Sequence, residues 1–535
     1  MSDFAPPFLA PRRTLLSCLA IAGFIAADAL SNRAQAEPTQ RFYIKEYRVD
    51  GAKRLKPLEV EEAVYPFLGP GRTAGDVEQA RQALEKVYHD KGFQTVSVVV
   101  PPQDPRRGII RLQIAESKVG RLRVKGSDWF LPSRIKEEVP SVAEGTVPNL
   151  TRFGYELNAA NRMADRGIVP VLRPGVEPGT VDIDLNVEDK SPLHGSLELN
   201  NRYSANTSSL RLNGGLSYSN LFQLGHTLGG NFQIAPEDLD DAQVYSGYYL
   251  ARVAEKTSLM LQGTKQNSDI STLGGAAVSG RGEIIGLHAL FDLPITKGFY
   301  QTVNLGVDYK QFDEDIVVGS DTISSPIEYY PFSANYSANW LEDNSFTDLN
   351  LSLNFHLRGM GSDADDFNDK RIKASGSFLY LRADASHTHD LSNGSQVFGK
   401  LQGQASTSPL INSEQIAGGG LGNVRGYLEA TALGDNGLFG TFEFRSPSFF
   451  GKPTLSTKAE NEWRFHAFAD VGVVGIYEAL PGQDSESWFS SVGIGTRADI
   501  RKHYHGSLDV GVPLVEQGET KPGDVRVTFR GWADF

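Results

Sequence analysis

Hydrophobic and polar residues alternate with a period of two from about residue 193 to the end of the chain. One segment, for example, carries hydrophobic side chains at alternate positions: Leu210, Leu212, Leu216 and Tyr218. Successive side chains of a β-strand point to opposite faces, so each segment has one apolar and one polar face. Segments of about ten residues with this pattern are typical of transmembrane β-strands. The pattern therefore predicts a membrane β-barrel.

Sixteen such segments can be counted, and short and long connections alternate between them. They start near residues 194, 208, 224, 242, 256, 281, 299, 326, 346, 374, 395, 437, 463, 488, 503 and 524. An even number of strands, short periplasmic turns and long external loops are expected of a single-chain bacterial barrel. The connection at 447–461 is longer than this scheme predicts. The alternative is a soluble β-sandwich, which does not account for long polar loops gathered at one end.

The last segment, 524–535, is apolar on one face and ends in Phe535. A strand edge left open in lipid would leave backbone groups without hydrogen-bond partners, so the last strand must pair with the first. We therefore expect Phe535 to end the strand that closes the barrel.

Residues 37–117 have a different period and predict a small α/β unit. The expected elements are a strand at 42–49, a helix at 58–65, a longer helix that begins at Thr73, and strands at 95–100 and 109–116. Thr73 and Asp76 have the spacing of a capping box. Gly92 suits the left-handed position that closes a helix.

The same order of elements recurs in residues 118–192. The expected elements are a strand at 119–125, helices at 132–139 and 150–166, and strands at 169–172 and 181–188. We expect Gly167 to close the second helix. Two βααββ units of similar length form an internal repeat, and such units usually stack.

Residues 1–36 have the organisation of a secretory signal peptide. Arg12 and Arg13 precede the apolar stretch Leu15–Ala27, and Ala34-Gln35-Ala36 offers small residues for cleavage. A stretch of about 13 apolar residues is too short to span a bilayer, which excludes a membrane anchor. The chain is therefore expected to leave the cytoplasm.

Composition excludes several classes of function. The net charge of −13 argues against nucleic acid as a partner. The only cysteine, Cys18, lies inside the predicted signal, so the rest of the chain has no disulfide or thiolate metal site. No other segment approaches the roughly 18 apolar residues of a transmembrane helix.

No residue pattern predicts catalysis, a cofactor or a metal. The glycine-rich run 418–422 does not lie between a strand and a helix, and 451–454 lacks the first glycine of a phosphate loop. Two histidine pairs have the spacing of metal ligands but no acidic or thiol cluster beside them: His387 with His389, and His503 with His505. No nucleophile lies beside a recognisable base. The sequence therefore predicts a protein that is not an enzyme.

Several motifs, taken in order, resemble the two-partner secretion transporters, the haemolysin and haemagglutinin exporters of the BamA-type superfamily. The resemblance lies in Val100-Pro101-Pro102-Gln103 with Gly108, Leu157-Asn158, Pro174-Gly175, Leu199-Asn200-Asn201, Asn220-Leu221, Gly422-Asn423-Val424-Arg425-Gly426-Tyr427 and Phe468-Ala469-Asp470-Val471-Gly472. It implies an outer-membrane barrel of sixteen strands preceded by two periplasmic POTRA domains.

The resemblance also implies domain boundaries. They are 1–36 for the signal, 37–117 and 118–192 for the POTRA domains, 193–535 for the barrel, and 406–436 for a loop inside the lumen. Family members often carry an N-terminal helix that plugs the barrel. Only Glu37–Arg41 separate the predicted cleavage site from the first strand, so no plug helix is expected.

The resemblance assigns the site to two motifs, one in the lumen loop and one on the thirteenth strand. Their residues are Gly422, Val424, Arg425, Gly426 and Tyr427 in the loop, and Phe468, Asp470 and Gly472 on the strand. Asp470 falls on the face expected to line the lumen, and an arginine fork suits a carboxylate. We expect Arg425 to pair with Asp470, with a contribution of about 1 kcal/mol in a wet lumen.

Arg425 and Asp470 also have plainer interpretations, as a solvated loop arginine and an ordinary lumen carboxylate. The charge swap Arg425→Asp with Asp470→Arg would test the pair.

The resulting hypothesis is export of a large unfolded exoprotein to the cell surface. The expected partners are this secreted client, outer-membrane lipid and the barrel assembly machinery, with no nucleic acid. POTRA sheet edges could capture the client by strand addition. Two alternatives remain: a BamA-type assembly factor that inserts other barrels, and a passive porin. A porin needs neither the N-terminal repeat nor the loop motif.

Overall fold

The computed structural model describes residues 40–535 except 269, 272–277, 280, 314, 319–320, 452–453 and 456–459. The predicted signal peptide, residues 1–36, lies outside the described residues. Of residues 37–41, where no plug helix was expected, only residues 40 and 41 are described. The chain divides between Ser191 and Pro192 into two compact units.

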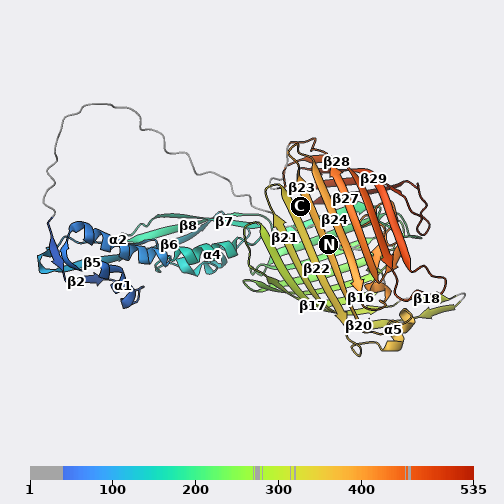
Figure 1. Cartoon of the computed structure of the whole chain (residues 1–535), viewed down its shortest axis with the longest axis horizontal. Coiled ribbons are helices and arrows are strands. Elements are labelled where there is room, and N and C mark those ends of the chain that lie inside the picture. The colour runs from blue at the N-terminus through green and yellow to red at the C-terminus, as the bar shows by residue number, and fades with distance from the viewer. Residues whose placement is uncertain are drawn as a thin grey trace. The chain divides into compact units, whose positions relative to one another are not determined.

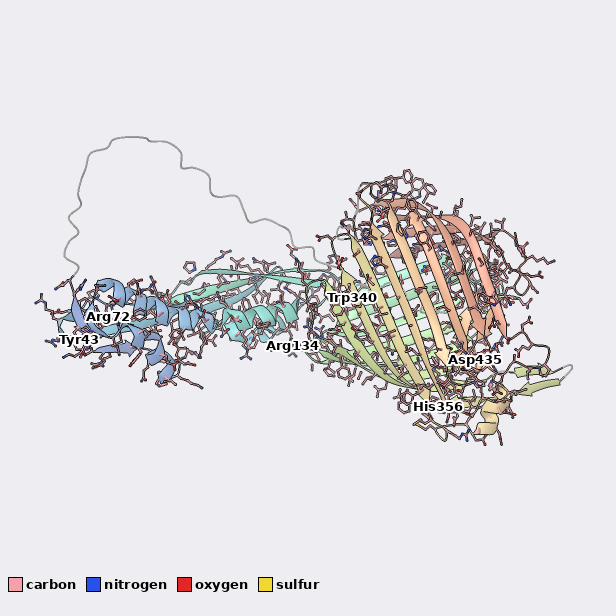
Figure 2. All side chains as sticks on the ribbon, in the orientation of Figure 1. Tyr43, Arg72, Arg134, Trp340, His356 and Asp435 are labelled. Carbon is pink, nitrogen blue, oxygen red and sulfur yellow. The ribbon has the colours of Figure 1, made fainter. Side chains whose placement is uncertain are left out.

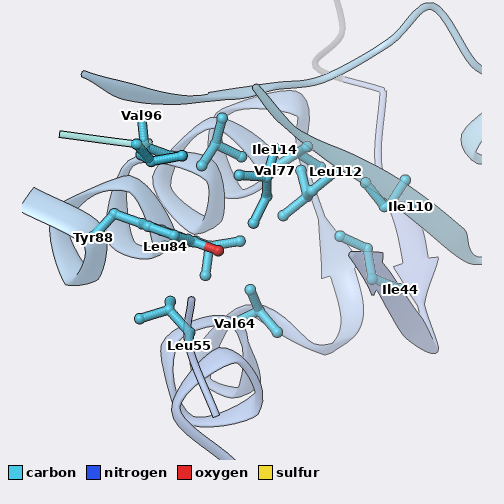
Figure 3. Close-up of a cluster of buried hydrophobic side chains, with 12 residues drawn as sticks. Ile44, Leu55, Val64, Val77, Leu84, Tyr88, Val96, Ile110, Leu112 and Ile114 are labelled. Atoms are coloured by element: carbon cyan, nitrogen blue, oxygen red, sulfur yellow. The ribbon is translucent and has the colours of Figure 1, made fainter. Parts of the chain in front are cut away.

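The first βααββ unit folds around one hydrophobic core (Figure 3). Its elements are β1 (Phe42–Ile44), β2 (Glu46–Asp50), α1 (Pro57–Val64), η1 (Tyr65–Phe67), β3 (Gly69–Arg72), α2 (Ala74–Asp90), β4 (Val96–Val99), η2 (Pro105–Arg107) and β5 (Ile109–Glu116). The sheet order is β2-β5-β4, with β2 parallel to β5, and β1 pairs with β3 beside it. α2 buries Leu84 and Tyr88 against this sheet.

The start of α2 confirms the predicted capping box. The Thr73 side chain accepts from the backbone N–H of Asp76, and the Asp76 carboxylate accepts from the backbone N–H of Thr73 at 2.8 Å. These bonds satisfy two donors that a helix start leaves without partners. Gly92 follows the helix with φ +90°, as predicted.

The second βααββ unit repeats the same topology, with sheet order β6-β8-β7 and β6 parallel to β8. Its elements are β6 (Lys118–Lys125), α3 (Pro132–Glu137), η3 (Pro140–Val142), α4 (Leu150–Ala160), β7 (Arg166–Pro174) and β8 (Thr180–Asp189). The unit has its own core, which includes Ile135, Phe153 and Leu185. The predicted internal repeat is confirmed.

The predicted end of α4 is wrong. The helix stops at Ala160, and Gly167 lies inside β7 instead of closing the helix. Asn161 explains the early end, because its side chain donates to the Ile168 carbonyl and accepts from the Ile168 N–H at 3.0 and 2.7 Å. A side chain that bonds to the backbone in this way competes with the helix, and residues 161–165 form the turn that leads into β7.

The second compact unit is a closed antiparallel barrel of sixteen strands, as predicted (Figure 1). The strands are β9 (Leu193–Asn200), β10 (Arg211–Leu221), β11 (His226–Ile234), β12 (Gln243–Ala254), β13 (Thr257–Asn267), β16 (Gly282–Asp292), β17 (Phe299–Phe312), β20 (Ile327–Tyr329) with β21 (Phe332–Leu341), β22 (Ser345–His356), β23 (Phe378–Asp390), β24 (Gln396–Ser406), β27 (Asn436–Arg445), β28 (Glu462–Gly475), β29 (Glu486–Ile500), β30 (Tyr504–Pro513) and β31 (Arg526–Asp534).

β20 and β21 are two segments of one strand, because both pair with β17. Pro331 separates them. Proline has no N–H to donate to a neighbouring strand, so it interrupts the ladder at this point.

The two faces of the barrel strands differ as the alternation predicted. In β28, for example, Phe468, Asp470 and Val474 are buried, whereas Phe465 and Val471 on the opposite face are exposed. Large apolar side chains such as Leu401 stand exposed on the outward face, where a membrane barrel contacts lipid.

The remaining elements lie in the connections between barrel strands. They are β14 (Ile270–Ser271), β15 (Val278–Ser279), β18 (Asp315–Val318), β19 (Asp321–Ser324), α5 (Ala364–Lys370), η4 (Asn412–Glu414), β25 (Ile416–Gly418) and β26 (Ala432–Gly434). Figure 2 shows His356 and Asp435 at the barrel end near α5, and Trp340 at the other end. Within the described residues, no helix is long and apolar enough to cross a membrane.

Residues 374–377, predicted to begin a strand, instead complete the α5 loop, because Ala374 packs into an apolar cluster with Phe367.

The last strand, β31, pairs with the first, β9, and closes the barrel. Phe535 extends this pairing: its N–H donates to the Gly195 carbonyl at 3.0 Å, and the Gly195 N–H donates back at 3.2 Å. The Arg530 guanidinium adds a two-point contact to the Glu198 carboxylate, at 2.9 and 2.8 Å.

Candidate functional site

The connection 407–435 between β24 and β27 folds back into the barrel. Its side chains contact inward-facing residues of strands on several parts of the wall, from β17 to β30. β24 and β27 pair directly with each other through nine residue pairs behind the loop. The loop is therefore an insertion into the lumen, and the wall is complete without it.

Arg425, near the tip of this loop, binds the Asp470 carboxylate in β28. Its Nε lies 2.8 Å from Asp470 Oδ2, and its Nη2 lies 2.8 Å from Oδ1. The backbone N–H of Arg425 donates to Oδ2 at 3.1 Å. Two parallel charge-assisted bonds fix both the position and the orientation of the arginine fork.

Three further groups surround the Arg425 guanidinium. Its Nη1 lies 2.6 Å from Glu443 Oε1 in β27 and 3.5 Å from Asp509 Oδ1 in β30. Its Cζ lies 3.6 Å from the ring centre of Phe468, a distance suited to a cation–π contact. The site is thus a cluster of acidic groups and one ring from three strands around a single loop arginine.

Two more arginines and a histidine contact these carboxylates. Arg445 and Arg497 both donate to Glu443, at 2.9 and 3.0 Å. His466 Nε2 lies 2.7 Å from Asp509 Oδ1. A buried network of this kind is stable only while every charge in it keeps a partner, because a buried charge without a partner is costly.

The burial of this network corrects the estimate of about 1 kcal/mol, which assumed a water-filled surrounding. Arg425 is 5% exposed, Asp470 0% and Glu443 1%. The lumen around the arginine is filled by the loop itself, together with Phe468. Removing one partner of a buried pair costs about 3–5 kcal/mol, so the relevant magnitude is several times larger.

The other loop-motif residues shape the tip. Gly426 has φ +94°, which a glycine adopts without strain. Val424 is buried, and a Cβ on Gly472 would lie only 3.2 Å from its Cγ2. The Tyr427 hydroxyl lies within 3.0 Å of the carbonyls of Ser490 and Val515. The structure therefore brings both motifs together: Gly422, Val424, Arg425, Gly426 and Tyr427 with Phe468, Asp470 and Gly472.

Gly422 makes a smaller contribution to this arrangement. Its carbonyl accepts from Lys400 Nζ of β24 at 3.2 Å. The left-handed glycines at the base of the tip are Gly419 and Gly420, with φ +95° and +96°.

Two more anchors, which sequence reasoning missed, hold the loop. Glu429 accepts two bonds from Arg202, at 2.7 and 3.2 Å, and thereby ties the loop to the β9–β10 connection. Asp435 accepts from the Leu410 N–H, from Arg371 and from the Tyr477 N–H, at 2.8, 2.9 and 2.6 Å. Neither carboxylate belongs to a short motif.

The histidine pairs considered in the sequence lie apart from this site. His387 Nδ1 lies 2.8 Å from Thr347 Oγ1, and His505 Nδ1 lies 2.5 Å from Asp499 Oδ1. In the part of the chain that the structure describes, no three potential ligands are grouped to hold a metal ion. Lys452 and Pro453 of the glycine–lysine segment lie outside the described residues.

Family comparisons match the two units of the chain. The family model "POTRA domain, ShlB-type" matches residues 42–117, and "Haemolysin secretion/activation protein ShlB/FhaC/HecB" matches residues 179–498. The second match spans more than half of the chain.

The chain belongs to the ShlB/FhaC/HecB family of haemolysin secretion/activation proteins.

Similar proteins include two transporters of this kind. The outer membrane transporter CdiB of Escherichia coli O6:K15:H31 (strain 536 / UPEC) is 23% identical over 504 residues, which cover 91% of this chain and 82% of that protein. The hemolysin transporter protein ShlB of Serratia marcescens is 23% identical over 493 residues, covering 89% and 82%. The chain is therefore an outer-membrane transporter of the two-partner secretion type, with its POTRA domain in the periplasm.

Solved structures agree on the fold. CdiB from Escherichia coli has a TM-score of 0.61 and 20% identity, covering 95% of this chain and 93% of that one. BamA from Haemophilus ducreyi, lacking POTRA domains 1–3, has a TM-score of 0.56 and 14% identity, covering 92% and 100%. At these identities the likeness shows the fold alone.

Proposed function

We propose that this transporter exports one large, unfolded exoprotein through its lumen, and that loop 407–435 must leave its docked position for the client to pass. The observation that carries the proposal is the way in which the loop is fastened. Arg425 holds it to the inner wall through side-chain contacts, while β24 and β27 pair behind it. The loop can therefore move without opening the wall.

The pair of Arg425 and Asp470 suits a loop that docks on the wall and leaves it again. The bidentate contact between Arg425 and Asp470 gives the loop one defined docked position. The two charges lose their hydration when they are buried, and this cost offsets most of the energy that their pairing gains. Such a pair therefore contributes more to fixing one position of the loop than to net stability. In the proposed cycle the arginine and its carboxylates are hydrated when the loop swings aside, and they pair again after the client has passed.

The two βααββ units are proposed to capture the client before export. We assign the second unit, 118–192, as a POTRA domain because it repeats the topology of the first. Each three-stranded sheet has an outer strand on both sides of its central strand, β5 or β8. An extended client segment can add to such an edge through main-chain hydrogen bonds. Because the periplasm supplies no ATP, folding of the client outside the cell would drive its passage.

The proposal also covers the remaining partners. Outer-membrane lipid would contact the exposed apolar face of the barrel, and the barrel assembly machinery would insert the chain through its last strand, which Phe535 extends. No catalysis and no nucleic-acid partner are part of the proposed function.

Deletion of residues 37–192 tests the capture role. The full chain or the truncated barrel is produced with a candidate client, a large exoprotein sought among the neighbouring genes, and the client is measured in the medium. Heat-dependent electrophoretic mobility controls for barrel assembly. We expect the truncated barrel to assemble without secreting the client, and secretion at the normal level would refute capture by these units.

Outer-membrane protein levels in cells that lack the chain distinguish an exporter from a BamA-type assembly factor. If the chain assembled other barrels, its loss would deplete several outer-membrane proteins, whereas an exporter affects only its client.

A further inference from the structure

A buried glutamate in the first limb of the lumen loop forms a further contact network, separate from the Arg425 motif. Glu414 lies in η4 and is 1% exposed. Lys310 Nζ of β17 donates to its Oε1 at 2.6 Å, and the Tyr329 hydroxyl of β20 donates to the same oxygen at 2.6 Å. The Tyr380 hydroxyl of β23 donates to Oε2 at 2.5 Å. One loop carboxylate thus receives donors from three strands.

The backbone beside Glu414 is held as well. Arg382 Nη2 of β23 donates to the Glu414 carbonyl at 3.0 Å, and Gln404 Nε2 of β24 donates to it at 3.2 Å. A carboxylate and a carbonyl of one residue therefore accept five bonds from the barrel wall. This saturation explains how a charged side chain tolerates nearly complete burial.

Apolar packing surrounds this polar network. Leu410 and Ile411 of the loop pack against Phe312, Tyr329 and Tyr380. The α5 side chain Phe367 belongs to the same cluster. Burial of these side chains favours a docked limb but does not select one position, because hydrophobic contacts are not directional. The Glu414 bonds are directional, so they fix the register of the limb on the wall.

The two networks use different strands. Glu414 contacts β17, β20, β23 and β24, whereas Arg425 contacts β27, β28 and β30. We infer that Glu414 is a further positioning residue of the lumen loop: it holds the first limb, and Arg425 separately holds the tip. The role in export rests on the proposed function, in which the loop must be released from the wall.

A nitroxide label reports each anchor directly. The full chain with Cys18→Ser has no other cysteine, so a single cysteine can carry the label. Asn412, exposed and beside Glu414, reports on the first limb, and Leu421 reports on the tip. The motion of the label is measured by electron paramagnetic resonance in parent and variant barrels reconstituted in vesicles. Heat-dependent electrophoretic mobility is the control for folding.

Glu414→Gln removes the negative charge that accepts hydrogen bonds from Lys310, Tyr329 and Tyr380. We expect the Asn412 label to gain a mobile component several-fold larger than in the parent, and the Leu421 label to stay immobile. Glu516→Gln, the same change on an exposed carboxylate outside the loop, should leave both labels unchanged. Tyr380→Phe deletes one hydroxyl and keeps the ring, so it should give a smaller mobile fraction and remains informative if Glu414→Gln does not assemble.

The outcomes separate this inference from the proposed function. An immobile Asn412 label in both Glu414→Gln and Tyr380→Phe would overturn the anchor, and release of both labels together would overturn separate anchors. Release of the Asn412 label alone, with unchanged pore conductance and unchanged client secretion, would leave the anchor standing and refute its role in export.

Discussion

Replacing Arg425 by alanine should release the tip of the lumen loop. The substitution leaves Asp470, which is fully buried, without its two-point partner, and it removes one of the three arginines around Glu443. Loss of one partner from a buried pair costs about 3–5 kcal/mol. Since about 1.4 kcal/mol is a tenfold change in an equilibrium constant, the docked loop should lose roughly a hundredfold to a few-thousandfold in population relative to the released loop.

Asp470→Ala should be milder than Arg425→Ala. In that variant Arg425 keeps Glu443 at 2.6 Å and Asp509 at 3.5 Å, so its charge stays partnered. In the double variant the second change should add little to the first. We expect a coupling energy of about 0.5–3 kcal/mol, as for residues in direct contact.

Amide hydrogen exchange of the loop in the purified full chain measures these free energies, because exchange reports local opening. Loop amides should exchange faster in Arg425→Ala, while amides of the β24–β27 ladder keep their protection. Client secretion is measured beside it. If the two single changes add without coupling, the pair does not act as a unit, and normal secretion in both single variants would remove its functional role.

The charge swap that the sequence suggested as a test should fail to restore docking of the loop. With Arg425→Asp and Asp470→Arg, the new carboxylate at 425 would face Glu443 and Asp509. Like charges at close range repel, so the swap should not restore docking. Restored secretion in the swapped variant would contradict the role of Glu443 and Asp509 beside Arg425.

Three other predictions concern the tip, a helix cap and the barrel. Gly511→Ala should impair export, because its Cβ would lie 2.8 Å from the Gly426 nitrogen, whereas Gly506→Ala, with no such atom closer than 3.9 Å, should secrete normally. Thr73→Ala should cost about 1 kcal/mol in the first turn of α2, measured by amide exchange. The hydrogen bond from the Thr73 hydroxyl lowers the pKa of Asp76. The stabilisation of the helix by this cap is therefore present above the ordinary pKa of about 4 and is lost as pH falls through the lowered value. Protection of that turn that does not change with acid would contradict this. The purified chain should be β-rich with heat-dependent electrophoretic mobility, and a mainly helical circular dichroism spectrum would refute the fold.

Much of the architecture could be predicted from local sequence. Strand alternation depends only on which face each side chain occupies, so sixteen strands were visible without long-range information. The Thr73 cap is a contact between residues three apart. The end of α4 was missed because it depends on Asn161 bonding to Ile168 across a turn, a choice that helical periodicity does not reveal.

The site was only partly predictable. Motif resemblance suggested Arg425 with Asp470, residues 45 positions apart. Glu443 and Asp509 were missed, although both are charged residues on the inward face of predicted strands, and that signal could have singled them out. Glu414 gave no comparable signal, because its partner Lys310 lies 104 residues away and no spacing rule connects them.

Photo-crosslinking of a stalled client inside the barrel tests the central claim most directly. A photoreactive residue is placed in β24 at Gln402, which faces the lumen beside Asp384, or at its neighbour Leu401, which is 60% exposed on the outer face. Passage through the lumen predicts a client adduct at position 402 and none at 401. An adduct at 401 alone, or no adduct at 402 while the client is secreted, would contradict export through this barrel.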